Sequence, residues 1–272
     1  MKRLISIFFL GLCACSSGFD AKRQVEVLDS RVGPKKADDS DAKPDTPDAA
    51  RTKLITEPFV MVPVATDIDP FPRRPKISVP PDTKVLYSVQ IKAYGSGDKS
   101  MRYQTHGVAI STPLTYERFD RDIAPLVSDA AALPNGTALL FEWTTNGGGT
   151  GAMAWDAVPV RLPVLATARD IAGAQPELHE SRKLNPDGKT FRTAFSQAVR
   201  VSLTPEATTR LSRWSADKQE HPIASAVKGR VMDVSVLGAG TTVYLDLEWL
   251  PEEDRKGASE LLAAELRAVA GK

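Results

Sequence analysis

Histidine is the side chain best suited to acid–base catalysis near neutral pH, and it is a frequent metal ligand. The chain has three histidines, His106, His179 and His221, and they are too scattered to form an H-x-x-x-H metal pair. A Ser-His-Asp set around His106 or His179 carries no information, because serine and aspartate are abundant and such a set is defined by geometry. His221 precedes Pro222 and is expected to be a surface or capping residue. The sequence therefore predicts neither catalytic residues nor metal ligands.

A glycine-rich stretch is the next candidate, because glycine loops can bind phosphate groups. Residues Gly147 to Ala152 match the pattern G-x-G-x-x-A after an expected strand. A dinucleotide site needs a helix directly after the glycines, whereas the segment 155–164 contains two prolines and is expected to be extended. Gly95-Ser96-Gly97 lacks the G-x-S-x-G spacing of a nucleophile elbow. Loops without a bound cofactor are therefore expected at both places.

Other polar and aromatic residues have simpler explanations. Asp67 and Asp69 beside Pro70, and Asp187 in Asn185-Pro186-Asp187-Gly188, are typical turn formers rather than calcium ligands. The tryptophans could line a groove for peptide or glycan. However, three of them lie on the apolar side of expected elements, which favours core packing: Trp143, Trp214 and Trp249.

Cys15 is the residue with the clearest predicted chemistry. Residues 1–14 have a basic start, an apolar run from Leu4 to Leu12 and small residues before Cys15, which is typical of a signal peptide. Leu12-Cys13-Ala14-Cys15 resembles the lipobox of bacterial lipoproteins. Cys13 follows the bulky Leu12 and is the poorer cleavage position. The resemblance implies a thioether-linked diacylglycerol and usually an N-acyl chain, such as palmitate, on Cys15, and several acyl chains anchor a protein stably.

The predicted anchor places the protein in the cell envelope. The run from Leu4 to Leu12 is shorter than the roughly 20 residues that span a bilayer, and no second long run occurs. We therefore expect a membrane contact only through the lipid on Cys15. By analogy with enteric lipoproteins, Ser16 after the cysteine favours the outer membrane, facing the periplasm, over the inner membrane.

The composition is that of a globular protein, with 42% hydrophobic and 25% charged residues. Removal of Lys2 and Arg3 with the signal peptide changes the formal charge from +1 to −1, which gives no support for nucleic acid binding. Cleavage also removes Cys13, so Cys15 is the one remaining cysteine and is acylated. No intramolecular disulfide and no cysteine metal site are therefore expected.

Residues 15–83 are predicted to be a disordered tether that starts at the lipidated cysteine. The stretch Gly33 to Lys53 is dominated by Pro, Asp, Lys, Ala and Thr, a composition that buries too little apolar surface to offset the entropy of ordering. The segment from Glu57 to Pro81 is expected to be disordered or to dock on the folded part as extended chain.

An α+β module is predicted over residues 84–161. Residues 84–93 alternate between apolar and polar side chains and predict a strand, and residues 103–111 are expected to return antiparallel. The spacing of Tyr116, Phe119, Ile123 and Val127 predicts a helix that Pro125 kinks or splits. Leu139, Phe141 and Trp143 share one face of a further strand over residues 137–144.

A second α+β module is predicted over residues 162–272. Phe191 to Leu203 is expected to be a strand, followed by a helix that Thr204-Pro205-Glu206 starts. Lys228-Gly229-Arg230 predicts a tight hairpin turn between strands 223–227 and 231–236. After a strand at 243–249, a last helix is expected to begin near Pro251. Its predicted buried stripe consists of Ala258, Leu261, Leu262 and Val269.

The second module resembles the head subdomain of the first periplasmic domain of SecD, also found in SecDF. Four ordered pieces carry the resemblance: 162–174, 201–207, 226–231 and 250–253. The SecD family usually has aspartate at the position of Lys228. The resemblance implies a compact periplasmic domain that contacts an extended polypeptide, but SecD works with membrane helices that are not found in this sequence.

The sequence favours a non-catalytic protein- or peptide-binding module, with an envelope protein or an extended polypeptide as the partner. A sheet edge that accepts a strand is a suitable binding mode. The alternative is a periplasmic enzyme, such as a hydrolase, whose site is not recognisable from sequence. A structural component of an envelope complex is the third hypothesis. The sequence does not indicate an oligomeric state.

Overall fold

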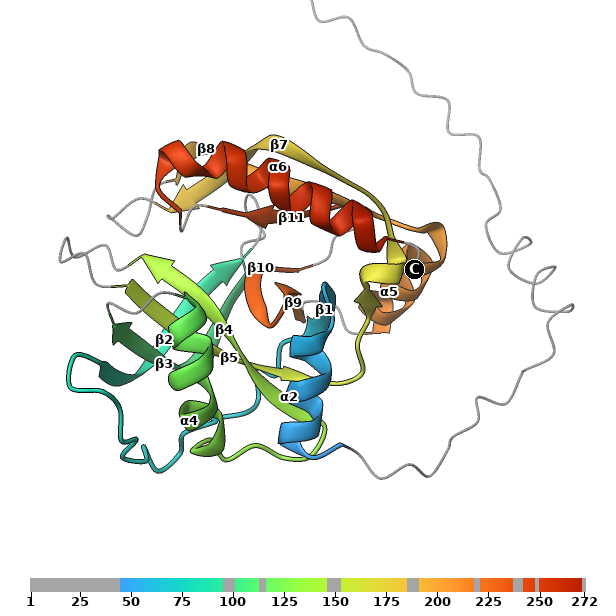
Figure 1. The fold of residues 1–272 in the computed structure, drawn as a ribbon. Coiled ribbons are helices and arrows are strands. Elements are labelled where there is room, and N and C mark those ends of the chain that lie inside the picture. The colour runs from blue at the N-terminus through green and yellow to red at the C-terminus, as the bar shows by residue number, and fades with distance from the viewer. Residues whose placement is uncertain are drawn as a thin grey trace, which may run out of the picture. The chain divides into compact units, whose positions relative to one another are not determined.

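The computed structural model describes residues 45–94, 101–112, 116–145, 153–184, 191–217, 221–236, 242–247 and 250–270. Residues 44–272 form one compact unit. Its described part contains helices with an eight-stranded and a three-stranded sheet, both mainly antiparallel (Figure 1). The predicted α+β class is therefore confirmed.

The larger sheet combines strands from distant parts of the chain. Its order is β2 (Lys84–Tyr94), β3 (Met101–Thr112), β5 (Met153–Arg161), β4 (Thr137–Thr145), β10 (Arg230–Val236), β9 (Pro222–Val227), β1 (Val60–Pro63) and β6 (Ala166–Thr167). Neighbouring strands are antiparallel except for β4 and β10, which are parallel. The smaller sheet is antiparallel in the order β11 (Thr242–Asp246), β8 (Phe191–Leu203) and β7 (Ile171–Leu184).

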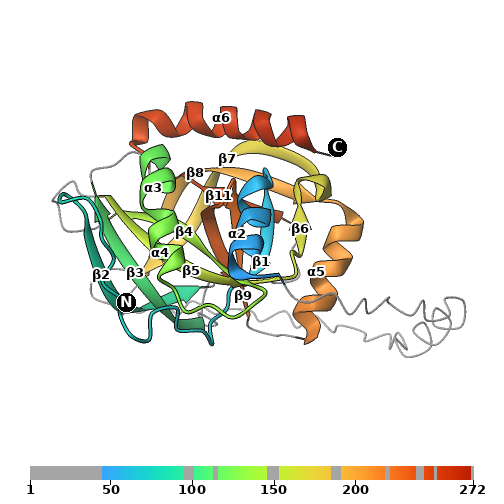
Figure 2. The ribbon, with the colours of Figure 1, turned by 60° about the horizontal axis from the view of Figure 1, so that its bottom comes forward.

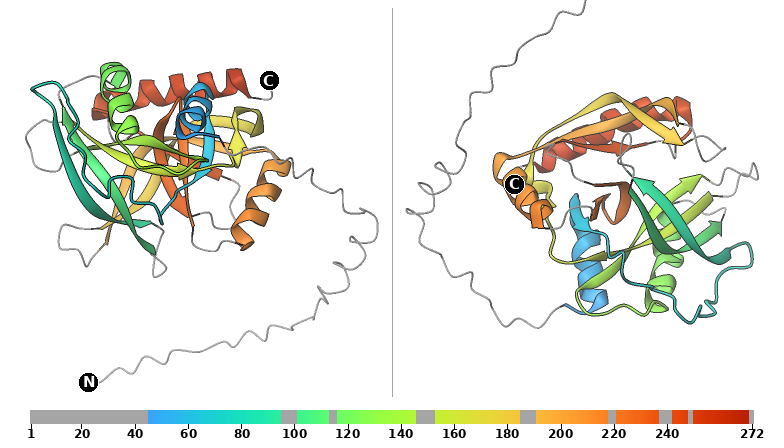
Figure 3. Two further views of the ribbon diagram at one scale, coloured as in Figure 1. Left: turned by 90° about the horizontal axis from the view of Figure 1, so that it is seen from below. Right: turned by 180° about the vertical axis from the view of Figure 1, so that it is seen from behind.

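Helices cover both sheets. They are α2 (Pro47–Thr56), α3 (Tyr116–Asp122), α4 (Ala124–Asp129), the 3-10 turn η2 (Ala168–Asp170), α5 (Pro205–Asp217) and α6 (Glu252–Val269). The long helix α6, red in Figures 1 and 2, lies along β7 and β8. Helix α5, orange in Figures 2 and 3, lies on the same side as β6, and its Arg210 forms an ion pair with Asp170 of η2.

Several local predictions are confirmed. Strand β8 has the predicted limits, and the helix expected after residue 115 is divided into α3 and α4 just before Pro125. Phe119 and Ile123 are buried, with 1% and 0% of their surface exposed. They pack in one cluster with Phe141 from the predicted apolar face of β4. Local apolar spacing and proline therefore determined these elements.

The structure corrects the predicted tether at residues 45–56, which include helix α2, whereas the segment 57–81 docks on the folded part, the second of the two expectations for it. Helix α2 starts after Thr46, whose side chain accepts a hydrogen bond from the Ala49 amide, and Leu54 in this helix is 1% exposed. Strand β1 is buried at all four residues and lies between β9 and β6. The apolar run at residues 59–64 is short, but four residues suffice for a central strand. Residues 15–44 lie outside the described part.

The predicted modules 84–161 and 162–272 share one sheet. Phe141 of β4 is the register partner of Arg230 in β10, so strands from both sides of residue 161 are hydrogen-bonded neighbours. The predicted boundary between residues 161 and 162 therefore runs through the eight-stranded sheet and does not separate it from the three-stranded sheet.

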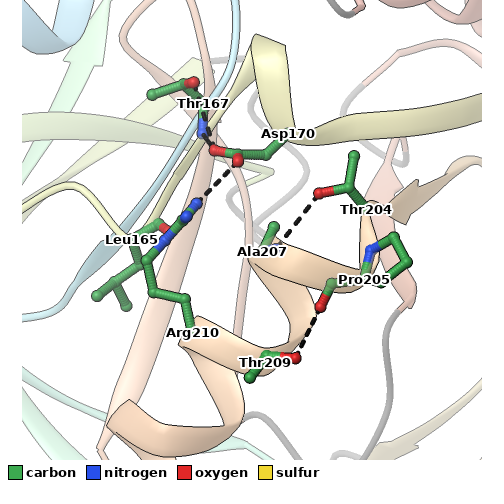
Figure 4. A network of polar contacts seen from close by, with 8 residues as sticks. All are labelled: Leu165, Thr167, Asp170, Thr204, Pro205, Ala207, Thr209 and Arg210. Carbon is green, nitrogen blue, oxygen red and sulfur yellow. Dashed lines mark hydrogen bonds and ion pairs between the residues drawn. The ribbon is translucent and has the colours of Figure 1, made fainter. Parts of the chain in front are cut away.

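A polar network fixes the junction of η2 and α5 (Figure 4). The Asp170 carboxylate accepts a hydrogen bond of 2.8 Å from the Thr167 amide and forms an ion pair of 2.8 Å with Arg210. The Arg210 Nε also donates to the Leu165 carbonyl at 2.8 Å. At the start of α5 the Thr204 hydroxyl accepts a hydrogen bond from the Ala207 amide, as predicted for a helix cap.

The buried stripe of α6 differs from the predicted one. The helix buries Ser259, Ala263 and Leu266, whereas Leu261 is 64% exposed. Ala258, Leu262 and Val269 are only partly buried. Helix α6 therefore has more apolar surface than its core contacts cover.

Candidate functional site

An apolar cavity of about 240 Å³ lies between α6 and the turn that joins β9 and β10. Its lining residues are Val227, Lys228, Arg230, Met232, Leu247, Leu250, Ala258, Leu261, Leu262 and Glu265. Three separate chain segments contribute to it, and seven of the ten lining residues are apolar. We call this feature the α6 cavity.

The wall of the α6 cavity is one face of the helix. Ala258, Leu261, Leu262 and Glu265 have the i, i+3, i+4, i+7 spacing that places side chains on one side of an α-helix. In the first turns of α6, Arg255 Nε donates a hydrogen bond of 2.8 Å to the Leu250 carbonyl, which holds the segment before the helix in place. The surplus apolar stripe of α6 is therefore positioned by hydrogen-bonded structure at its N-terminal end.

The rim of the cavity carries charge. Lys228 Nζ lies 3.3 Å from Glu265 Oε2, and these side chains are 65% and 50% exposed. Such an exposed ion pair contributes about 0–1 kcal/mol to stability. Arg230, the first residue of β10, adds a second cation to the lining. The Lys228–Glu265 pair therefore contributes little to the stability of the fold.

The turn that presents Lys228 has an unusual residue choice. Lys228 and Gly229 have φ values of 49° and 82°, the pattern of a type I′ turn, as the sequence predicts. Asn, Asp or Gly usually occupies the first of these positions, and another residue with left-handed φ costs about 1–2 kcal/mol. Strain of this kind, where the residue also lines a cavity, is a reason to consider function.

The volume limits what the α6 cavity can hold. A cavity of about 150 Å³ accommodates benzene, and pockets for drug-sized ligands start at about 300 Å³. The α6 cavity, at about 240 Å³, lies between these values. It therefore fits one large apolar side chain or two small ones.

A second unusual feature is the carboxyl group of Asp233 in β10. Burial is the main cause that raises its pKa from 3.8 to about 7, and the nearby carboxylates of Glu142 and Asp246 raise it further. Hydrogen bonds from Ser235 and from the Val234 amide oppose the shift only in part. Asp233 is therefore largely protonated below neutral pH.

The histidines do not form a catalytic group in the described structure. His179 lies opposite Ser196 in the register of β7 and β8, and Ser196 Oγ donates to Asp246 Oδ2 at 3.1 Å. A triad needs the carboxylate on the histidine and the histidine on the serine. Here the carboxylate binds the serine, and the His179 ring stacks on Tyr244 with centroids 3.9 Å apart. This arrangement is cross-strand packing.

Other predicted roles are structural as well. Asp69 Oδ1 accepts a hydrogen bond of 2.9 Å from the Phe71 amide, as expected for a turn former, and Asp67 pairs with Arg161 at 2.9 Å. His221 is exposed and lies against Trp214, with ring centroids 6.4 Å apart. Trp143 packs on the buried Trp155, which stacks on Phe119.

Some candidates fall outside the described part of the structure: Cys15, Gly95–Gly97, Gly147–Ala152, Asn185–Gly188, Trp249 and the His106 side chain. Among the described residues, no group of three or more His, Cys, Asp or Glu side chains is arranged to hold a metal ion. None of the described helices combines the length and hydropathy needed to cross a membrane.

Sequence reasoning missed the α6 cavity and Asp233. Each apolar residue of the lining fits a buried strand or helix face, so the sequence alone does not distinguish the cavity from the core. The sequence does contain one signal for the cavity. The apolar residues of α6 cover a wider face of the helix than packing against a single sheet can bury. For Asp233 the signal was an acidic residue inside the apolar strand 231–236.

Comparison with known proteins identifies a weak structural similarity. No protein-family model matches the chain, and no curated protein matches it. A weak structural similarity exists to the membrane component SecDF, which enhances protein export. The match has 13% identity and a TM-score of 0.28, and it covers 77% of this chain and 93% of that chain. A similarity of this size carries no argument about the function of this chain.

Proposed function

We propose that the protein is a lipid-anchored component of the cell envelope that binds other proteins or extended peptides and does not catalyse a reaction. The α6 cavity is the proposed contact, and it takes an apolar side chain of the bound chain. The observation that supports this is an exposed apolar lining of side-chain size, with Leu261 64% exposed at its wall. The predicted resemblance to the SecD head agrees with a polypeptide ligand.

The chemistry of the cavity favours binding over hydrolysis. Its charged groups are Lys228, Arg230 and Glu265, and its lining includes no serine, cysteine or histidine. Hydrolases of the nucleophilic type need a nucleophile beside a base. The alternative of a periplasmic enzyme would therefore have to use a different part of the protein.

We propose that lipid on Cys15 holds the protein on the outer membrane, facing the periplasm. Replacing Cys15 by Ala should abolish incorporation of labelled palmitate, because the thioether cannot form, and should move the protein from the membrane fraction to the soluble fraction. Labelling and fractionation of cells that express each form measure this. Cys13→Ser serves as the matched control and should leave both results unchanged. A Cys15→Ala protein that is still acylated would refute the anchor.

Replacing Leu261 by Lys should weaken binding of a fluorescent peptide that carries one phenylalanine among serine and glycine. The substitution removes apolar contact worth about 1–2 kcal/mol, which corresponds to a five- to thirtyfold loss of affinity. Fluorescence anisotropy with the full chain in detergent measures it. Because Leu261 is exposed, the free energy of unfolding should change by less than about 0.5 kcal/mol.

Two comparisons make this experiment decisive. Leu86→Lys alters a leucine of similar exposure, 56%, that does not line the α6 cavity, and it should bind the peptide as the unchanged protein does. A peptide with serine in place of phenylalanine should bind weakly to every form. Equal affinity of the unchanged protein for both peptides would refute the proposed function of the cavity.

A further inference from the structure

The smaller sheet has an open edge that is separate from the α6 cavity. We propose that residues 178–184 of β7 pair with the same residues of a second copy of this chain, so that the smaller sheets of two copies join edge to edge. This inference goes beyond the proposed function, because it concerns a different surface and does not depend on a ligand in the α6 cavity.

The first argument is the unequal protection of β7. Among the described strands, β8 is the sole neighbour of β7, so one side of β7 is a sheet edge. In an edge strand, the backbone groups of alternate residues point away from the neighbouring strand. The Ala174 carbonyl accepts a hydrogen bond of 2.6 Å from Arg267 of α6, and Pro176 has no amide hydrogen. Leu178 and Glu180 continue this alternation, and no described contact protects their backbone groups in the same way.

The second argument is exposed apolar surface beside this edge. Leu178 and Phe195 are 63% and 62% exposed. Leu178 lies opposite Gln197 in the register of β7 and β8. Glu180, two residues further along, lies opposite Phe195, so these side chains share one face of the sheet. It is the face that α6 covers, because the Gln197 amide donates a hydrogen bond of 3.1 Å to Ser259 Oγ. The helix therefore leaves two apolar side chains uncovered next to the open edge.

The third argument is the charge complementarity of the edge with itself. In a two-fold antiparallel pairing centred on Ser181, Glu180 of each copy lies opposite Arg182 of the other. The same register places Leu178 opposite Leu184. A pairing centred on Glu180 or on Arg182 would instead place like charges directly opposite each other, which is destabilising. The sequence of the open edge therefore favours the register centred on Ser181.

The pairing would join both smaller sheets into one continuous sheet. Its two-fold axis is perpendicular to the sheet, so the α6 helices of both copies lie on the same face. On that face Leu184 of the second copy is the register partner of Leu178, and the dimer covers apolar surface that one copy leaves exposed. On the other face His179 lies opposite Lys183. Because only one short strand of each copy takes part, we expect a reversible dimer with a small interface.

Disulfide trapping in cells that express the full chain tests the pairing. The backbone groups of Ser181 point to β8, so the two copies of this residue form a pair with Cα atoms about 4.5 Å apart, a separation that a disulfide spans. With copper phenanthroline as oxidant, Ser181→Cys should give a linked pair of identical chains on a non-reducing gel. The unchanged protein shows whether Cys13 or Cys15 forms a link by itself.

Thr193→Cys is the matched control, because Thr193 is an exposed residue of the neighbouring strand β8. Three strand spacings, about 14 Å, would separate its two copies in the dimer, which is too far for a disulfide. This variant should therefore remain unlinked under the same conditions.

Exchange of charges tests the register. Added to Ser181→Cys, either Glu180→Arg or Arg182→Glu should reduce the linked fraction about three- to tenfold, because like charges then face each other twice. The two changes together restore opposite charges and should recover most of the linked fraction. Since Glu180 is exposed, Glu180→Arg should keep the melting temperature of the unchanged protein, which excludes a general loss of folding.

The outcomes separate the possible occupants of the edge. If Ser181→Cys is linked no more than Thr193→Cys, the pairing is overturned. Linkage mainly to a different protein would overturn the second copy as the occupant and would identify the edge as a site for another chain. Equal linkage in all charge variants would overturn the register. Peptide binding by the α6 cavity is measured separately, so failure here leaves the proposed function intact.

Discussion

Replacing Asp233 by Asn should make the protein more stable at about pH 8 and should flatten its stability between about pH 4 and pH 7. The folded environment raises the pKa of this carboxyl from 3.8 to about 7. In this range the unfolded chain releases the proton whereas the folded chain keeps it. The stability that Asp233 contributes is therefore fully present below about pH 4 and is lost as the pH rises to about 7.

The expected size of this effect is large. Raising the pKa from 3.8 to about 7 corresponds to about 4 kcal/mol, and because Asp233 is only partly buried, as judged by its exposed surface, this is reduced to about 2–4 kcal/mol. Urea unfolding at several pH values, followed by tryptophan fluorescence, measures it. Asp129→Asn changes an exposed aspartate and should keep the pH slope of the unchanged protein. An Asp233→Asn protein that is less stable at every pH, with the same slope, would contradict the expectation.

Replacing Gly229 by Ala should lower the free energy of unfolding by about 2–4 kcal/mol. Gly229 has φ +82°, and an added Cβ would lie 2.6 Å from Cγ2 of Ile55 in α2. The left-handed backbone accounts for about 1 kcal/mol and the steric overlap for about 1–3 kcal/mol. Chemical unfolding of the purified protein measures the sum.

A double-mutant cycle isolates the steric part. In an Ile55→Ala background Cγ2 is removed but Cβ remains 3.2 Å from the added Cβ, so Gly229→Ala should cost about 1–2 kcal/mol there. Gly257→Ala is the matched control, because this glycine lies inside α6 with nothing within 4 Å of an added Cβ. It should stabilise the protein by up to about 1 kcal/mol. The same cost for Gly229→Ala in both backgrounds would exclude the contact with Ile55.

The sequence predicts elements whose signals are local. The limits of β8, the division of the helix before Pro125, the Thr204 cap and the Lys228-Gly229 turn each depend on a few neighbouring residues. Strand β1 was missed because its neighbours in the sheet, β9 and β6, are distant in sequence, so its burial depends on contacts that no local pattern contains.

The α6 cavity could not be predicted for a related reason. Val227, Leu250 and Leu261 belong to separate segments, and each has a residue type that is compatible with an ordinary core. Whether such residues meet closely or leave a space depends on the packing of α6 against the β9–β10 turn. Leu261 was predicted to be buried and is 64% exposed, because the helix turns Ser259, Ala263 and Leu266 toward the sheet instead.

The position of β1 makes the order of folding depend on residues far apart in the chain. Val60 pairs with Ala226, so an early segment of the chain completes its sheet only after a late one has been made. Pairings between distant residues slow folding, because the intervening loop must close first. Strand β1 therefore lacks its β9 partner until the segment around residue 226 is available for pairing. Deletion of either β1 or β9 would remove one of these two paired strands from the larger sheet.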